Sequence, residues 1–149
     1  MRISHFLAIA GVAIGIAGCS QKPVVQGVGP QLTEADMPHP KPGLWAVKSA
    51  VTGARQSCLS GQLLPLFTVR TDCTQNSRQR SADGGVMMDS RCQSSSGSSH
   101  VMTSATGDYQ SAFAVNLVMS SSNGPSIKDH LDYTFVGPCA AGQHPDDQP

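Results

Sequence analysis

The sequence predicts a mainly β domain: an antiparallel meander of about seven strands forming a curved sheet or small barrel, with one short helical turn. Apolar and polar side chains alternate along several short runs, as in strands with one buried face. Amphipathic helical spacing is almost absent. A sheet with one apolar face must curl, pair with a second sheet or be covered by other segments.

The first part of the domain contains two expected strands and the helical turn. Strands are expected over residues 44–51 and 55–58, because apolar and polar residues alternate there and Thr-Gly separates the two runs. The segment 60–67 is rich in leucine and predicts a helical turn. We expect Ser60 to cap this turn and Pro65 to interrupt it.

The rest of the domain is expected to be a meander of hairpins. Along residues 86–92, Val86, Met88 and Cys92 fall on one face, while Asp89 and Arg91 fall on the other. The expected strands are 71–79, 86–92, 100–106, 109–119 and 127–135, separated by a turn at 82–85 and loops at 94–99 and 120–125.

Residues 1–18 have the features of a bacterial lipoprotein signal peptide. The apolar run 6–17 is too short to span a bilayer, which takes about 20 apolar residues. It ends in Ile-Ala-Gly-Cys, which matches the lipobox and implies a diacylglycerol thioether on Cys19, cleavage before Cys19 and acylation, for example with palmitate, of the new amino terminus. Ser20 then favours the outer membrane. The alternative is an ordinary cleaved signal peptide that leaves Cys19 as a spare thiol.

The remaining chain divides into three parts. We expect a lipid anchor and flexible tether over residues 19–42, a disulfide-stapled β domain over 43–139, and a disordered tail over 140–149. After Arg2 the chain carries nine Lys and Arg and ten Asp and Glu. Without a basic stripe to neutralise phosphates, nucleic acid is not an expected partner.

Four cysteines remain besides the one in the lipobox. An even number in an exported chain predicts two disulfides, and three connectivities are possible. Counting outward from the turn at 82–85 places Cys73 opposite Cys92, near the reach of a disulfide. This pairing leaves Cys58 with Cys139.

Short motifs along residues 41–139 resemble an uncharacterised bacterial family, domain of unknown function 3617. The family's members are exported proteins, so the resemblance implies the same compartment and architecture, but no activity. Ala46 and Ser60 depart from its usual residues. The motifs are Lys41-Pro-Gly-Leu-Trp45, Cys58-Leu-Ser60, Asp72-Cys73, Arg91-Cys92 and Gly137-Pro-Cys139.

Catalysis has little support in the sequence. His130 is expected to point away from the core, and neither a G-x-S-x-G elbow nor a metal-binding H-x-x-x-H is present. We expect no enzyme, metal site or cofactor, and a hydrolase is the least favoured function. The acid–base candidates are His100, His130, Asp108, Asp129 and Asp132.

The expected function is therefore a non-catalytic envelope module that binds or interacts with a partner. Its expected partners are the membrane, through Cys19, and an unidentified envelope protein. The alternative is a carrier that holds a small apolar ligand in a barrel pocket, unless the same side chains simply fill the core. Those side chains are Phe113, Val115, Leu117, Leu131, Tyr133 and Phe135.

Overall fold

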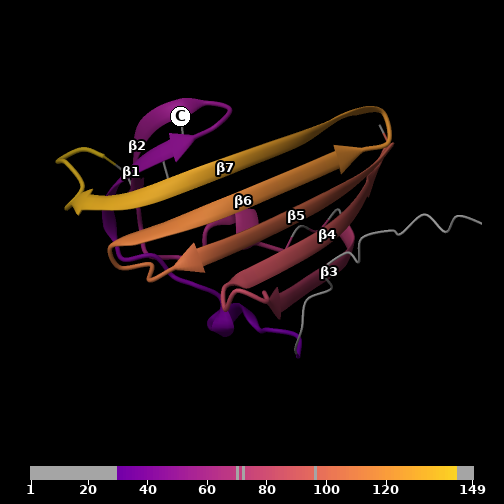
Figure 1. The fold of residues 1–149 in the computed structure, drawn as a ribbon, viewed down its shortest axis with the longest axis horizontal. Helices are drawn as coiled ribbons and strands as arrows, with labels where there is room; N and C mark the ends of the chain where they lie inside the picture. Colours follow the sequence, from indigo (N-terminus) through magenta and orange to yellow (C-terminus); the bar gives the residue numbers. More distant parts are fainter. Residues whose placement is uncertain (1–29, 70, 72, 96, 144–149) are drawn as a thin grey trace, which may run out of the picture.

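The computed structural model describes residues 30–69, 71, 73–95 and 97–143. Seven strands form one curved antiparallel sheet in the order β2-β1-β7-β6-β5-β4-β3 (Figure 1). This order ends in two different edge strands, so the expected meander is confirmed as a curved sheet, and the alternative of a closed barrel is wrong. The strands are β1 (Gly43–Ser49), β2 (Gly53–Leu59), β3 (Cys73–Arg80), β4 (Val86–Ser94), β5 (Gly97–Gly107), β6 (Ala112–Ser121) and β7 (Gly124–Gly137).

The core lies on one face of the sheet and is centred on Trp45, which is completely buried. The Trp45 ring makes edge contacts with Phe113 and Phe135, at centroid distances of 5.0 and 5.4 Å. Phe113 stacks on Tyr133 at 4.3 Å. The Trp45 Nε1–H donates to the Lys41 carbonyl at 3.0 Å, so the indole's one polar group is satisfied inside the core.

The helical segments differ from the prediction. A 3₁₀ turn, η2 (Pro65–Phe67), begins at the proline instead of being interrupted by it, because proline's fixed φ and missing N–H suit the first helical position. Ser60 is not its cap: the Ser60 hydroxyl accepts from the Gln62 N–H at 3.3 Å. The sequence did not predict a second 3₁₀ turn, η1 (Glu34–Asp36).

Two of the expected loops are largely strand. In place of a loop at 94–99, β4 continues to Ser94, which pairs with Gly97 of β5. In place of a loop at 120–125, β6 continues to Ser121, which pairs with Gly124 of β7. Serine, glycine and proline favour turns, but here the hairpin ladders extend and satisfy the backbone groups.

The expected strand over 109–119 begins later than the sequence suggests. Tyr109 lies in the turn between β5 and β6, with a φ of 56°, and β6 starts at Ala112. The Asp108 carboxylate caps this turn by accepting from three backbone N–H groups. An Asp that satisfies several N–H groups stabilises a turn, so the strand starts only after it.

The segment expected to be a tether up to residue 42 is part of the domain from about Leu32. The Leu32 N–H donates to the Arg78 carbonyl of β3 at 2.7 Å. Met37 is 2% exposed and Pro40 is buried, because they cover apolar side chains at one end of the sheet. The signal peptide, Cys19 and the tail over 144–149 lie outside the described residues. None of the helical segments that the structure describes has the length and apolar character of a membrane-crossing helix.

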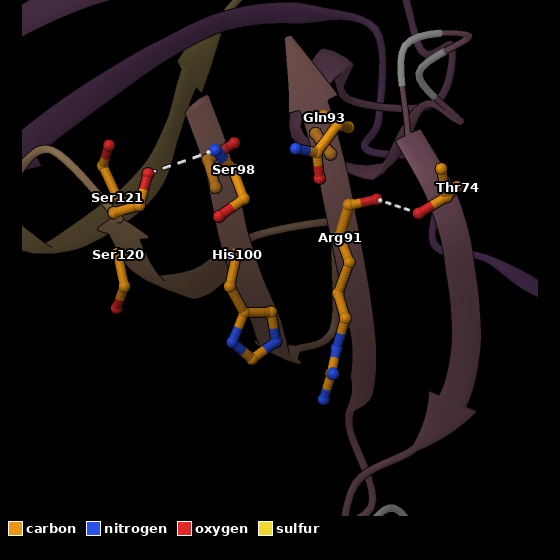
Figure 2. Close-up of a pocket in the computed structure, with 10 residues that line it drawn as sticks. Thr74, Arg91, Gln93, Ser98, His100, Ser120 and Ser121 are labelled. Carbon is orange, nitrogen blue, oxygen red and sulfur yellow. Dashed lines mark hydrogen bonds between the residues drawn. The ribbon is translucent and has the colours of Figure 1, made fainter. Parts of the chain in front are cut away.

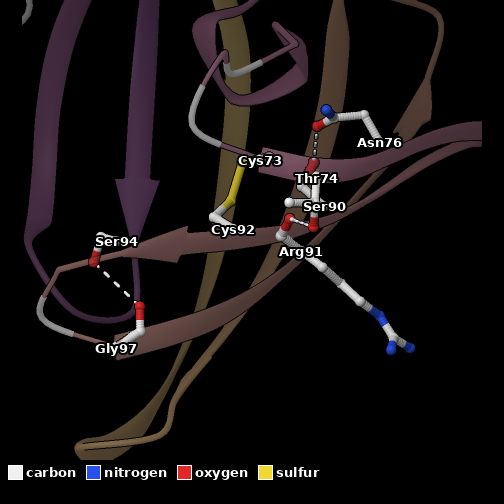
Figure 3. The surroundings of a disulfide bond; sticks show 8 residues. All are labelled: Cys73, Thr74, Asn76, Ser90, Arg91, Cys92, Ser94 and Gly97. Atoms are coloured by element: carbon white, nitrogen blue, oxygen red, sulfur yellow. Dashed lines mark hydrogen bonds between the residues drawn. A yellow bond between two sulfur atoms is a disulfide. The ribbon is translucent and has the colours of Figure 1, made fainter.

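Two disulfides staple the sheet, in the pairing that the sequence favoured. Cys73 and Cys92 occupy facing positions on β3 and β4, as Figure 3 shows, with a Cα–Cα distance of 3.7 Å. Cys58 of β2 joins Cys139, just after β7, with a Cα–Cα distance of 5.6 Å. The second bridge therefore ties the early part of the domain to its C-terminal end.

Candidate functional site

A solvent-open groove of about 560 Å³ lies where β4, β5 and β6 approach their serine-rich turns (Figure 2). We call it the serine-rich groove. The Ser122 and Ser98 backbones hydrogen-bond here, with the Ser122 N–H donating to the Ser98 carbonyl at 2.9 Å. Its lining includes Thr74, Arg91, Gln93, Ser98, His100, Ser120 and Ser121.

Three side chains of this groove form a row across adjacent strands. Arg91 of β4 pairs with His100 of β5, and His100 pairs with Ser120 of β6. Because paired residues of an antiparallel sheet point to the same face, the three side chains are neighbours. Figure 2 shows them extending in the same direction. This is the face opposite to the core.

Hydrogen-bond donors predominate in this row. The Arg91 side chain is exposed, and its guanidinium makes no hydrogen bond or ion pair with the rest of the described chain. The His100 Nε2 lies 2.9 Å from the Asp89 Oδ2. The Ser120 hydroxyl lies 3.5 Å from the hydroxyl of Ser126. The groove thus presents a guanidinium, an imidazole and hydroxyls, and the Asp89 carboxylate beside it contacts His100.

The five acid–base candidates do not form one site. His130 points away from the core as expected, and its ring contacts Asn116 Oδ1 at 2.7 Å and Asp132 Oδ1 at 3.2 Å. His100 lies on β5 with Asp89 as its partner. Asp108 and Asp129 both serve turns, so they are structural carboxylates.

Hydrogen bonding keeps both turn carboxylates ionised. The pKa of Asp108 is held well below its usual range, first by the Ser111 hydroxyl and then by backbone N–H groups. Burial opposes ionisation of Asp129, but hydrogen bonds from the Ser49 hydroxyl and from backbone N–H groups lower its pKa. The Ser49–Asp129 contacts, at 2.8 and 3.0 Å, fix the turn between β1 and β2.

The six side chains of the expected apolar pocket do not line the serine-rich groove. Phe113, Val115, Leu131 and Tyr133 are buried in the core cluster, and Phe135 packs against it. Leu117 is half-buried on the same face, farther along β6. The interpretation that these residues fill the core is therefore the better one, because their rings pack on one another.

The structure thus defines the class of protein: a disulfide-stapled antiparallel β domain with a polar, donor-rich surface groove. No three His, Cys, Asp or Glu side chains of the described ranges are grouped so that they can hold a metal ion. Residues 40–139, about two thirds of the chain, match the family model described as protein of unknown function (DUF3617), and the chain belongs to that family. No curated protein and no solved structure matches the chain.

Sequence reasoning considered His100 only as an acid–base candidate and did not single out Arg91 as a binding group. The missing information was the register between β4 and β5. An expected loop over 94–99 left the pairing open, whereas pairing of Ser94 with Gly97 places Arg91 beside His100. Counting residues outward from a short turn between these two strands would have placed Arg91 beside His100.

Proposed function

We propose that this protein is a non-catalytic binding module of the bacterial cell envelope, anchored by lipid on Cys19. The serine-rich groove is its binding surface, and its ligand is an anionic group of an envelope component. The lipobox and Ser20 support the anchor and an outer-membrane destination facing the periplasm. Two disulfides support an oxidising compartment.

 The observation that carries this proposal is the Arg91 guanidinium beside His100, which makes no hydrogen bond or ion pair with any residue that the structure describes.

The chemistry of the groove suits an anion. A guanidinium offers several N–H donors in a planar fork that matches carboxylate and phosphate oxygens. With one ring nitrogen of His100 directed to Asp89, the further donor in this row is the Ser120 hydroxyl of the neighbouring strand. Asp89 contacts His100 at 2.9 Å and does not itself line the groove.

The same geometry argues against catalysis. A hydrolytic serine needs a base within hydrogen-bond reach, and that base must be oriented by a third group. His100 has its orienting partner, Asp89, but among the described residues no serine hydroxyl is hydrogen-bonded to the His100 ring. The groove is also open to solvent, so it does not exclude water from a reaction.

Binding is tested by titrating the full chain with inorganic phosphate and following backbone amide NMR signals. We expect saturable shifts at Arg91, His100 and Ser120, and about ten- to hundred-fold weaker binding in Arg91→Gln, as for loss of a hydrogen bond to a charged group. Arg80→Gln is the matched control, because Arg80 is an exposed arginine at the other end of the sheet. Equal weakening in both variants would show nonspecific charge attraction and would overturn the proposal.

The anchor is tested separately in the native host. Mass analysis of the membrane-extracted protein should find a diacylated, N-acylated Cys19 at the amino terminus, and Cys19→Ala should move the protein out of the membrane fraction. An unmodified Cys19 in the membrane-extracted protein would contradict the anchor without affecting the phosphate experiment.

A further inference from the structure

A second cleft, of about 330 Å³, lies at the end of the sheet opposite the serine-rich groove. We call it the turn cleft, because the β3–β4 and β5–β6 turns meet there and η1 borders it. Arg80 stands at the end of β3, Asp83 lies in the first turn, Tyr109 lies in the second, and Asp36 ends η1. Its volume lies at the lower end of the range of small-molecule sites, about 300–1,000 Å³.

Tyr109 is held in this cleft by an unusual backbone conformation. Its φ of 56° is in the left-handed region, which is unfavourable for a residue with a large side chain. The Asp108 cap fixes one side of the turn, and the Lys41 N–H donates to the Tyr109 carbonyl at 2.8 Å. Strained residues that neighbouring contacts hold in place occur preferentially at functional sites.

The Tyr109 hydroxyl is buried and has no hydrogen-bond partner in the part of the chain that the structure describes. Burial also raises the pKa of Tyr109, so the phenol stays protonated and is a donor at neutral pH. A buried hydroxyl without a partner is unfavourable, and a ligand that displaced the atoms covering it would relieve that cost.

The charges around this hydroxyl have both signs. The Arg80 guanidinium makes no hydrogen bond or ion pair within the described ranges. Hydrogen bonds from Thr33 lower the pKa of Asp36, and a hydrogen bond from the Ser81 hydroxyl does the same for Asp83. Both carboxylates are therefore ionised at neutral pH. Together with Arg80 they give the cleft two negative charges and one positive charge, so the ligand that complements all three carries an anionic group toward Arg80 and a cationic group toward the carboxylates.

We propose that the turn cleft binds a small zwitterion of the α-amino acid class. Its carboxylate accepts hydrogen bonds from Arg80 and the Tyr109 hydroxyl, and its ammonium group faces Asp36 and Asp83. This site is separate from the serine-rich groove and does not depend on the function proposed for it.

The test is an NMR titration of the full chain with glycine and with L-alanine, with acetate and methylammonium as half-ligands. We expect saturable shifts at Gly85 and Tyr109 with both amino acids, and at least tenfold weaker binding of each half-ligand. Arg80→Gln and Tyr109→Phe should each weaken L-alanine binding about tenfold or more, as for loss of a charged hydrogen bond. Arg91→Gln and Tyr133→Phe are the matched controls and should bind normally.

A second readout separates a binding role of the hydroxyl from a structural one. Without ligand, Tyr109→Phe should melt at the same temperature as the unmodified chain or higher, because it removes an unpaired buried hydroxyl. A lower melting temperature, the absence of saturable shifts with either amino acid, or acetate binding as tight as that of L-alanine would overturn the proposal. Loss of phosphate binding at Arg91 would leave it unaffected.

Discussion

The two disulfides should contribute unequally to stability, with the Cys58–Cys139 bridge contributing more. They close loops of very different length, with sequence separations of 81 and 19 residues. In the chain-entropy relation, these loops correspond to about 4.5 and about 3.2 kcal/mol at 25 °C, a difference of about 1.3 kcal/mol. The packing lost on truncation is similar, because Cys58 is 4% exposed and Cys92 is 6% exposed.

The experiment compares two double variants, Cys58→Ala/Cys139→Ala and Cys73→Ala/Cys92→Ala, with the oxidised chain. Removing both partners leaves no free thiol to form a new bridge. Equilibrium urea unfolding gives the free energy of unfolding, and the slope with urea shows whether the unfolded state has changed. We expect the first variant to lose more stability, by about 1.3 kcal/mol. Equal losses, or a greater loss from the β3–β4 variant, would refute the loop-entropy reasoning.

Three further substitutions test a turn, a capping carboxylate and the core. Gly85→Ala would place a Cβ 2.2 Å from the Ala105 carbonyl oxygen, so we expect the free energy of unfolding in urea to fall by about 1–3 kcal/mol. Gly124→Ala is the control, because there is open space around Gly124, and it should change that free energy by less than about 0.5 kcal/mol. Because folding lowers the pKa of Asp108, its stabilising contribution is present above the unfolded carboxyl pKa of about 3.9 and falls as the pH drops below that value. Asp108→Asn should therefore flatten the dependence of melting temperature on pH in this acid range, and an unchanged acid slope would contradict the cap. Trp45→Ala should cost about 3–5 kcal/mol because the side chain is fully buried, whereas the exposed Val136→Ala should have little effect.

The sheet was predictable because burial repeats every second residue. Val86 and Met88 are buried while Met87 and Asp89 are less so, and this alternation is visible in the sequence itself. The hairpin at 82–85 has a strong turn signal, so counting outward from it gave the Cys73–Cys92 pair. Local patterns of this kind depend only on neighbours along the chain.

The segment over residues 30–42 was not predictable in this way. Its contacts with the sheet are made by single residues, such as Met37 and Pro40, which follow no helical or strand period. A stretch of proline and polar residues therefore resembles a tether in sequence. Whether it packs depends on an apolar end of the sheet that exists only after the strands have paired.

The two proposed binding surfaces could not be predicted from the sequence for a related reason. The serine-rich runs favour loops by composition, but pairing with the neighbouring strand extends β4 and β6 through them. Arg91 and His100 become neighbours only through that register. Tyr109 likewise seemed to continue an apolar strand face, and the Asp108 cap placed it in a turn instead.

The packed N-terminal segment also limits where a lipid-anchored domain can work. If Cys19 carries lipid as proposed, 12 residues lie between it and Leu32, and this stretch reaches at most about 45 Å when fully extended. A tether that ended only at Pro42 would have allowed about 80 Å. Leu32 is bound to β3, and Thr74 of the same strand lines the serine-rich groove. Under that proposal the groove would stay within reach of the bilayer. The anionic partner proposed for the groove would then present its charge near the membrane, which favours components attached to the membrane over those deep in the periplasm.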